Sequence, residues 1–109
     1  MKIINRKEFL DLPANTLFSK YEECSFGPIE IKGDTAVGID FLSQQIADAI
    51  DDSSEDRFDI LIEAEKSGSS FRMDLHCEYR DGFFDKDQLF AVWEKEDVKM
   101  LIDRLNECL

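Results

Sequence analysis

The sequence predicts an α+β fold in which a mainly antiparallel sheet carries helices packed on one face. Short segments of alternating apolar residues, separated by Gly, Pro, Asn and Asp, are typical of antiparallel strands. The C-terminal segment instead has apolar residues at helical spacing. At 109 residues the chain is expected to form a single domain, residues 1–109, with one hydrophobic core.

The first predicted element is a short helix after Asn5. Asn is a favourable N-cap, and Glu8 stands at the position whose side chain reaches back to the cap. Ile4 and Phe9 occupy the positions of a hydrophobic staple, and Pro13 ends the helix.

A hairpin is expected next, from a strand at residues 16–23 and a second strand at residues 29–35. Ile29 and Ile31 share one face of the second strand, and Lys32-Gly33-Asp34-Thr35 supplies turn chemistry. Residues 41–50 are then predicted to be helical because their apolar side chains fall at i, i+4, i+7 and i+8. These side chains belong to Leu42, Ile46, Ala49 and Ile50.

The most regular alternation lies in residues 58–79. Apolar and polar side chains alternate over 58–65 and again over 71–79, with a Ser- and Gly-rich segment between the two stretches. This pattern predicts a second hairpin with one buried and one solvated face. Residues 88–93 are apolar on both faces, which fits either a central strand or a helix. An amphipathic C-terminal helix is predicted from Val98, Leu101, Ile102, Leu105 and Leu109.

Charge narrows the possible partners. The chain has 13 Lys and Arg against 25 Asp and Glu, a net charge of −12. Direct binding to nucleic acid or to an anionic membrane is therefore disfavoured, and a cationic protein would be attracted. No apolar run approaches the roughly 20 residues of a membrane span, and residues 1–10 lack the apolar core of a signal peptide, so a cytoplasmic location is expected.

The stretch DDSSEDRFD, residues 51–59, has five carboxylates in nine residues. As a calcium loop it is a poor match, because Asp56 stands where an EF-hand has Gly and Ile62 where it has Glu. Two interpretations remain: a solvated loop without function, or part of an acidic surface that competes for a groove built to hold phosphates.

If the acidic surface binds a partner, two groups of carboxylates are candidates. Those on the predicted strands are expected to form a rigid patch on the exposed sheet face, whereas those of residues 51–56 are expected to be mobile and to contribute less per residue. The strand group is Asp59, Glu63, Glu65, Asp74 and Glu78, and the loop group is Asp51, Asp52, Glu55 and Asp56.

Catalysis is not expected. His76 and Cys77 are neighbours, but on a strand their side chains point to opposite faces, which disfavours a catalytic dyad. His76 is instead expected to be an exposed polar residue. The chain has no Gly-rich phosphate loop and no C-x-x-C pair, so no cofactor and no metal are predicted. Of the adjacent Phe83 and Phe84, one is a candidate exposed interface anchor.

The stretches IKGDT (Ile31–Thr35) and RDGFFDKDQLFAVWEKEDVKMLIDRL (Arg80–Leu105) resemble small acidic proteins of bacteriophages and prophages, about a third of the chain. The resemblance implies a phage accessory context, in which such proteins block host nucleic-acid enzymes or defence complexes, and it transfers no functional residue. We therefore expect a non-catalytic acidic module that covers a basic, nucleic-acid-binding surface of a host or phage protein. The alternatives are an immunity-type protein and a small structural or assembly protein, and the sequence leaves the oligomeric state open.

Overall fold

The computed structural model describes residues 1–50 and 54–109. It has a seven-stranded sheet in which β1, β7, β2, β4, β5 and β6 lie side by side in this order, and β3 pairs with β2. All pairings are antiparallel. The elements are β1 (Lys2–Ile4), α1 (Arg6–Leu10), β2 (Thr16–Glu22), β3 (Ser25–Phe26), β4 (Glu30–Ala36), β5 (Asp40–Gln45), α2 (Ser54–Ser67), β6 (Tyr79–Arg80), β7 (Leu89–Val92) and α3 (Lys95–Asn106).

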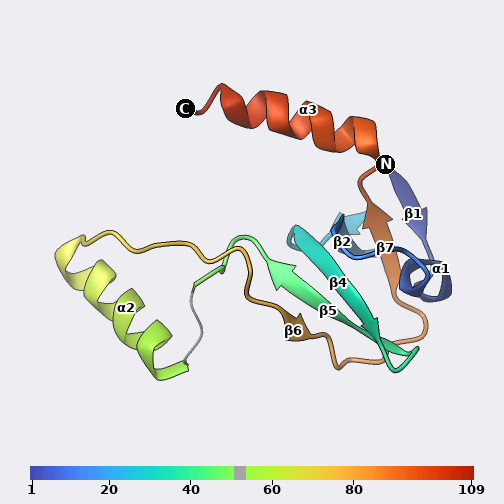
Figure 1. Ribbon diagram of the computed structural model, residues 1–109, viewed down its shortest axis with the longest axis horizontal. Coiled ribbons are helices and arrows are strands. Elements are labelled where there is room, and N and C mark those ends of the chain that lie inside the picture. Colours follow the sequence, from blue (N-terminus) through green and yellow to red (C-terminus); the bar gives the residue numbers. More distant parts are fainter. Residues whose placement is uncertain (51–53) are drawn as a thin grey trace.

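The α+β class, the antiparallel sheet and the C-terminal helix are confirmed. The predicted position of the helices holds for α1, which packs against β7, whereas α2 and α3 lie away from the strands (Figure 1). The radius of gyration is 15.7 Å, against about 13 Å for a compact domain of this length. The chain is therefore more extended than a domain in which every helix covers the sheet.

The core is a cluster of four fully buried phenylalanines and Val92. Phe9 of α1 stacks on Phe90 of β7 with a centroid distance of 3.9 Å, and its ring meets Phe18 and Phe41 edge to face at 4.7 and 4.9 Å. The predicted N-cap positions this helix, since the Asn5 side chain accepts a hydrogen bond of 2.9 Å from the Glu8 backbone N–H. One turn of helix thus covers the aromatic face of the sheet.

The predicted pairing of the two strands after Pro13 is confirmed as β2 against β4, but the predicted turn at 32–35 is wrong. These residues continue β4, with a shift of register between Lys32 and Thr35 that absorbs the extra length. The chain reverses at residues 37–39, where Val37 and Gly38 have φ values of 49° and 74°. Gly33 and Asp34, which are typical turn residues, therefore lie in an irregularity of β4 instead of a turn.

The predicted helix at 41–50 is also wrong, because residues 40–45 form β5 in the interior of the sheet. Its buried polar residues are accommodated by hydrogen bonds: Ser43 Oγ donates to Glu30, and Gln44 Nε2 donates to the Gln45 carbonyl. Phe41 adds its ring to the core. Local helical spacing was therefore overridden by pairing with β4 and β6.

The predicted hairpin of 58–65 and 71–79 is wrong as well. Residues 54–67 form α2, and residues 71–78 have no strand. Phe58, Leu61 and Ile62 fall at i, i+3 and i+4, so the same residues that alternate with period two also satisfy a helix, and the Glu and Ala that follow are strong helix formers. Residues 88–93 fitted either a strand or a helix. In the structure Leu89–Val92 form β7, a central strand between β1 and β2.

Candidate functional site: a polar cleft and an exposed helix

A buried carboxylate organises the end of the sheet beside α1. Asp40 at the start of β5 is fully buried; its Oδ2 accepts from Arg80 Nε at 2.9 Å, and its Oδ1 accepts from the Gly82 backbone N–H at 3.1 Å. Burial opposes the charged form, but hydrogen bonds from the Phe41 backbone N–H, Arg80 and Gly82 outweigh it and lower the pKa of Asp40. Asp40 therefore stays ionised and fixes the segment that follows β6.

Asp81 extends this network to β2. Its carboxylate lies 2.5 Å from Lys20 Nζ and 3.8 Å from Arg6 Nη1, while Arg6 Nη2 donates to the Ile39 carbonyl at 2.8 Å. The Lys20 ammonium also lies 4.3 Å from the centre of the Phe83 ring. These contacts hold the 81–83 segment over the sheet.

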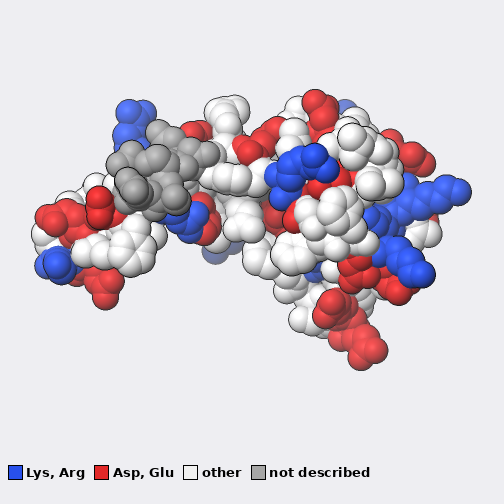
Figure 2. All heavy atoms as spheres, turned by 90° about the horizontal axis from the view of Figure 1, so that it is seen from below, with Lys and Arg blue, Asp and Glu red and all other residues white. Residues whose placement is uncertain are grey.

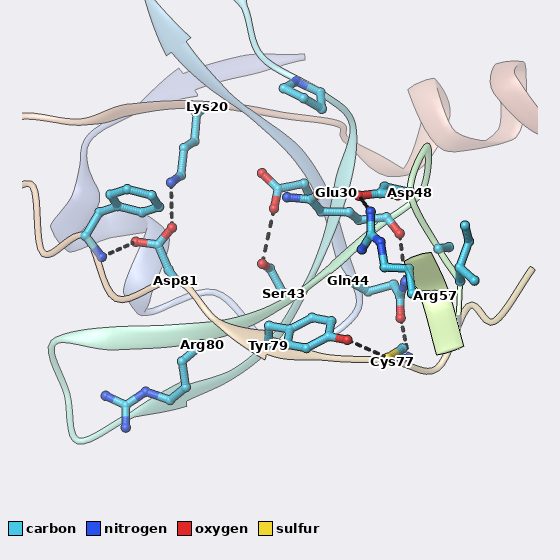
Figure 3. A pocket seen from close by; sticks show the side chains of 15 residues that line it. Lys20, Glu30, Ser43, Gln44, Asp48, Arg57, Cys77, Tyr79, Arg80 and Asp81 are labelled. Carbon is cyan, nitrogen blue, oxygen red and sulfur yellow. Dashed lines mark hydrogen bonds and ion pairs between the residues drawn. The ribbon is translucent and has the colours of Figure 1, made fainter. Parts of the chain in front are cut away.

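A cleft of about 470 Å³ lies between this segment, the strands β2, β4 and β5, and the first turns of α2 (Figure 3). Its volume is within the usual range for small-molecule sites. Its lining includes the cations Lys20, Arg57 and Arg80 and the acids Glu30, Asp48 and Asp81. Pro28, Tyr79 and Phe83 are uncharged parts of the wall.

Glu30 is the buried acid of this cleft, with 7% of its surface exposed. In register it pairs with Phe18, so its side chain lies on the same face of the sheet as the aromatic core. The alternation of Ile29 and Ile31 predicts the opposite, yet Ile29 is 36% exposed and Ile31 only half-buried. The sequence gives no signal for this inversion, because it places the charged Glu30 and Lys32 on the face opposite to Ile29 and Ile31.

Burial raises the pKa of Glu30, an effect that the hydrogen bond from Ser43 Oγ (3.1 Å) and the charge of Lys20 oppose. Between the unfolded and the folded pKa the folded protein binds more protons, so its stability falls as pH rises through this range. We expect Glu30→Gln to increase the free energy of unfolding at pH 7 and to have no such advantage below about pH 4, near the unfolded pKa of Glu.

The measurement is urea unfolding of both proteins from pH 3.5 to 8. The wild type should lose stability relative to the variant by at most about 1.4 kcal/mol per pH unit, the limit for one proton. A variant that is less stable than the wild type at pH 7 and equally so at pH 4 would contradict a raised pKa.

The segment before β6 is fastened to β5 through Gln44. Its Oε1 accepts from the Cys77 backbone N–H, and its Nε2 donates to the Asp74 carbonyl at 3.3 Å. Cys77 Sγ donates to the Tyr79 hydroxyl at 3.3 Å, and His76 is exposed, as expected. Both adjacent phenylalanines that were considered as anchors are exposed: Phe83 by 77% and Phe84 by 51%.

The acids predicted to form a rigid patch on the sheet are not brought together there. Asp59, Glu63 and Glu65 lie on α2, where Asp59 and Glu63 share a face and Glu65 does not. Asp74 and Glu78 lie in the irregular segment before β6, and the Glu78 carboxylate packs against Gly33. On the face drawn in Figure 2, carboxylates are spread among basic and uncharged side chains rather than joined in one row.

Two of the four loop acids have a different position from the one predicted. Glu55 and Asp56 belong to the first turn of α2 rather than to a loop, and Asp51 and Asp52 lie outside the described residues. The predicted contrast between fixed strand acids and mobile loop acids therefore has no structural basis.

The second candidate surface is the apolar stripe of α3, formed by Val98, Leu101, Ile102 and Leu105; Leu109, the last residue of the predicted stripe, lies beyond the end of the helix. A capping box between Glu94 and Asp97 starts the helix, and the Met1 amino group lies 2.7 Å from Asp97. The helix has no buried residue: Ile102 is 52% and Leu105 is 55% exposed. The predicted amphipathic pattern is thus present; Val98 and Leu101 are partly covered, whereas Ile102 and Leu105 are left exposed.

Among the described residues, no three His, Cys, Asp or Glu side chains are grouped as metal ligands, and no helix is long and apolar enough to cross a membrane. Comparisons of the chain with protein-family models, with curated proteins and with solved structures found no match.

Proposed function

We propose that this protein is a non-catalytic acidic binding module that docks on a basic, nucleic-acid-binding protein of a host or a phage and covers its nucleic-acid surface. The observation that carries the proposal is the apolar stripe of α3, whose Ile102 and Leu105 are exposed, in a chain of net charge −12. Apolar side chains that recur on one helix face usually pack against another surface. Here that surface is supplied by a partner.

The charge of the chain favours a cationic partner over a second copy of the chain. Two molecules of charge −12 repel each other at low ionic strength, whereas a basic protein is attracted and its approach is accelerated. Residues 94–109 themselves carry five acids and three bases, so the stripe is flanked by net negative charge. The stripe supplies apolar contact area, and the surrounding acids favour a positively charged rim on the partner.

The resemblance to phage accessory proteins is consistent with this function, because such proteins act on host complexes that bind nucleic acid. Occlusion requires only that the partner's basic surface be covered. It does not require the carboxylates to reproduce the spacing of phosphates, so it is compatible with acids that are dispersed over α2 and the sheet.

The test is capture of a partner from a bacterial lysate on the immobilised protein, followed by elution with salt and competition with double-stranded DNA. We expect a basic protein that is released by rising salt and that cannot hold DNA and this chain together. Ile102→Ser with Leu105→Ser should weaken its binding at least tenfold, since burial of each side chain contributes about 1.5 to 3 kcal/mol.

The matched control is Glu96→Ser with Lys99→Ser, which removes an exposed ion pair from another face of α3 without changing the net charge. It should change the affinity by less than twofold. Equal weakening by both variants would reject the stripe as the interface. A wild-type chain that forms particles by light scattering at every salt concentration would favour the assembly alternative.

A further inference from the structure

The cleft has one charged group that the protein does not neutralise. Each of its cations is held by a carboxylate: Lys20 by Asp81, Arg57 by Asp48, and Arg80 by Asp40. Among the described residues, Glu30 is within ion-pair distance of no cation. The charge that a ligand would complement is therefore negative.

The position of Glu30 directs this charge into the cleft. The residue is 93% buried, its Oε1 accepts from Ser43 Oγ at 3.1 Å, and Figure 3 shows its carboxylate on the cleft side of β4, with no interaction drawn to its second oxygen. With Oε1 already hydrogen-bonded to Ser43, the second oxygen is the one most readily offered to a cation. A contact to one oxygen suits the point charge of an ammonium group better than the two-pronged fork of a guanidinium.

The walls of the cleft suit an aliphatic chain. Pro28 and the rings of Tyr79 and Phe83 line it, and the two rings are 49% and 77% exposed. Methylene groups gain contact with such walls, and an ammonium gains from the nearby aromatic faces. A lysine side chain combines a slim apolar stem with a terminal ammonium.

We propose that the cleft receives the side chain of a lysine presented by the basic partner, with its ammonium bound to the Glu30 carboxylate and its stem between Tyr79 and Phe83. The proposal rests on the proposed function for the source of the lysine. It adds a specific pocket to an interaction otherwise carried by net charge and by α3.

The proposal implies that binding depends on pH. Burial raises the pKa of Glu30, so some molecules carry a protonated Glu30. A bound ammonium favours the ionised carboxylate, so these molecules must release a proton when they bind it. The groups that face Glu30 are Lys20, Ser43 and Asp81; the Coulombic effect of Asp81 raises its pKa and that of Lys20 lowers it. Affinity for an ammonium should therefore rise with pH above the usual titration range of a carboxyl.

The test is an NMR titration with N-acetyl-lysine methylamide, which follows the backbone amides of Ser43, Gln44 and Tyr79. We expect saturable shifts that the uncharged analogue N-acetyl-norleucine methylamide does not produce. Glu30→Gln should weaken binding at least tenfold, and Phe83→Ala, a change at an exposed ring, should weaken it severalfold. Asp59→Asn, which makes the same charge change on the exposed surface of α2, should leave it within twofold.

Several outcomes would overturn the proposal: equal binding by Glu30→Gln with an unchanged amide spectrum, equal shifts with the norleucine analogue, or no shifts at all. Butylamine that binds tighter than the lysine derivative would assign the cleft to free amines rather than to a partner. The lysine pocket and the proposed function can fail separately. If a partner is captured through α3 and Glu30→Gln does not change its affinity, only the lysine pocket is refuted. If the cleft binds the lysine derivative but no basic partner is captured, only the proposed function is refuted.

Discussion

Phe9→Ala is expected to destabilise the protein by about 3 to 5 kcal/mol, the range for removal of a fully buried aromatic side chain. Phe9 is the residue through which α1 reaches the core, where it contacts the other three buried phenylalanine rings. Among the described residues no second helix packs on this face of the sheet; the side chains beside the cluster are the partly buried Ile4, Leu10 and Leu12, which already have positions of their own. The expected measurement is a lower midpoint of urea unfolding, or loss of the cooperative transition.

Phe58→Ala is the matched control, because the same side chain on α2 is 66% exposed. It should change the free energy of unfolding by about 0.5 kcal/mol or less. If the two variants were destabilised equally, the core would not be centred on α1 as the structure has it.

Asp40→Asn is the second change with a large expected effect, about 3 kcal/mol at pH 7, because it leaves the buried Arg6 and the Arg80 side chain without their shared carboxylate. The folded pKa of Asp40 is lowered, so its contribution is fully present above the unfolded pKa of about 3.9 and is lost as pH falls through the folded value. The difference between wild type and variant should therefore shrink only in acid.

Urea unfolding at pH 7 and at pH 2 to 3 measures this effect, and Asp103→Asn on the exposed surface of α3 controls for the loss of one charge. The control should stay within about 0.5 kcal/mol of the wild type. A loss for Asp40→Asn that is the same at every pH would show that the carboxylate acts by shape rather than by charge.

The elements predicted correctly are those whose signals are local. Asn5 caps α1 through a hydrogen bond three residues away, as predicted. The C-terminal helix was predicted from its apolar spacing alone, and the structure adds a capping box of Glu94 and Asp97. Pro13 separates α1 from β2 at the expected place. A helix cap and a helix-ending proline act within one or two turns of chain, so a single sequence contains all of their cause.

The elements predicted wrongly are those in which two periods fit the same residues. Residues 41–50 fit a helix and residues 58–65 fit a strand, and the structure has the reverse in both places. Contacts with neighbouring elements decide between strand and helix. β5 pairs with two strands and places Phe41 in the core, whereas among the described residues no strand pairs with α2. The candidate rigid patch of acids depended on the second of these predictions and does not form.

The cleft was beyond prediction for a related reason. Glu30, Asp40 and Asp81 come from three separate parts of the chain, and only the register of β2, β4 and β5 places the first of them on the core face. By itself the sequence determined the class of the fold, the capped helix α1, the amphipathic C-terminal helix and the net negative charge of the chain. The tertiary structure decided which face of β4 is buried, that Ile102 and Leu105 of α3 remain exposed, and that an unneutralised carboxylate opens into a cleft, because each of these depends on contacts between residues far apart in the chain.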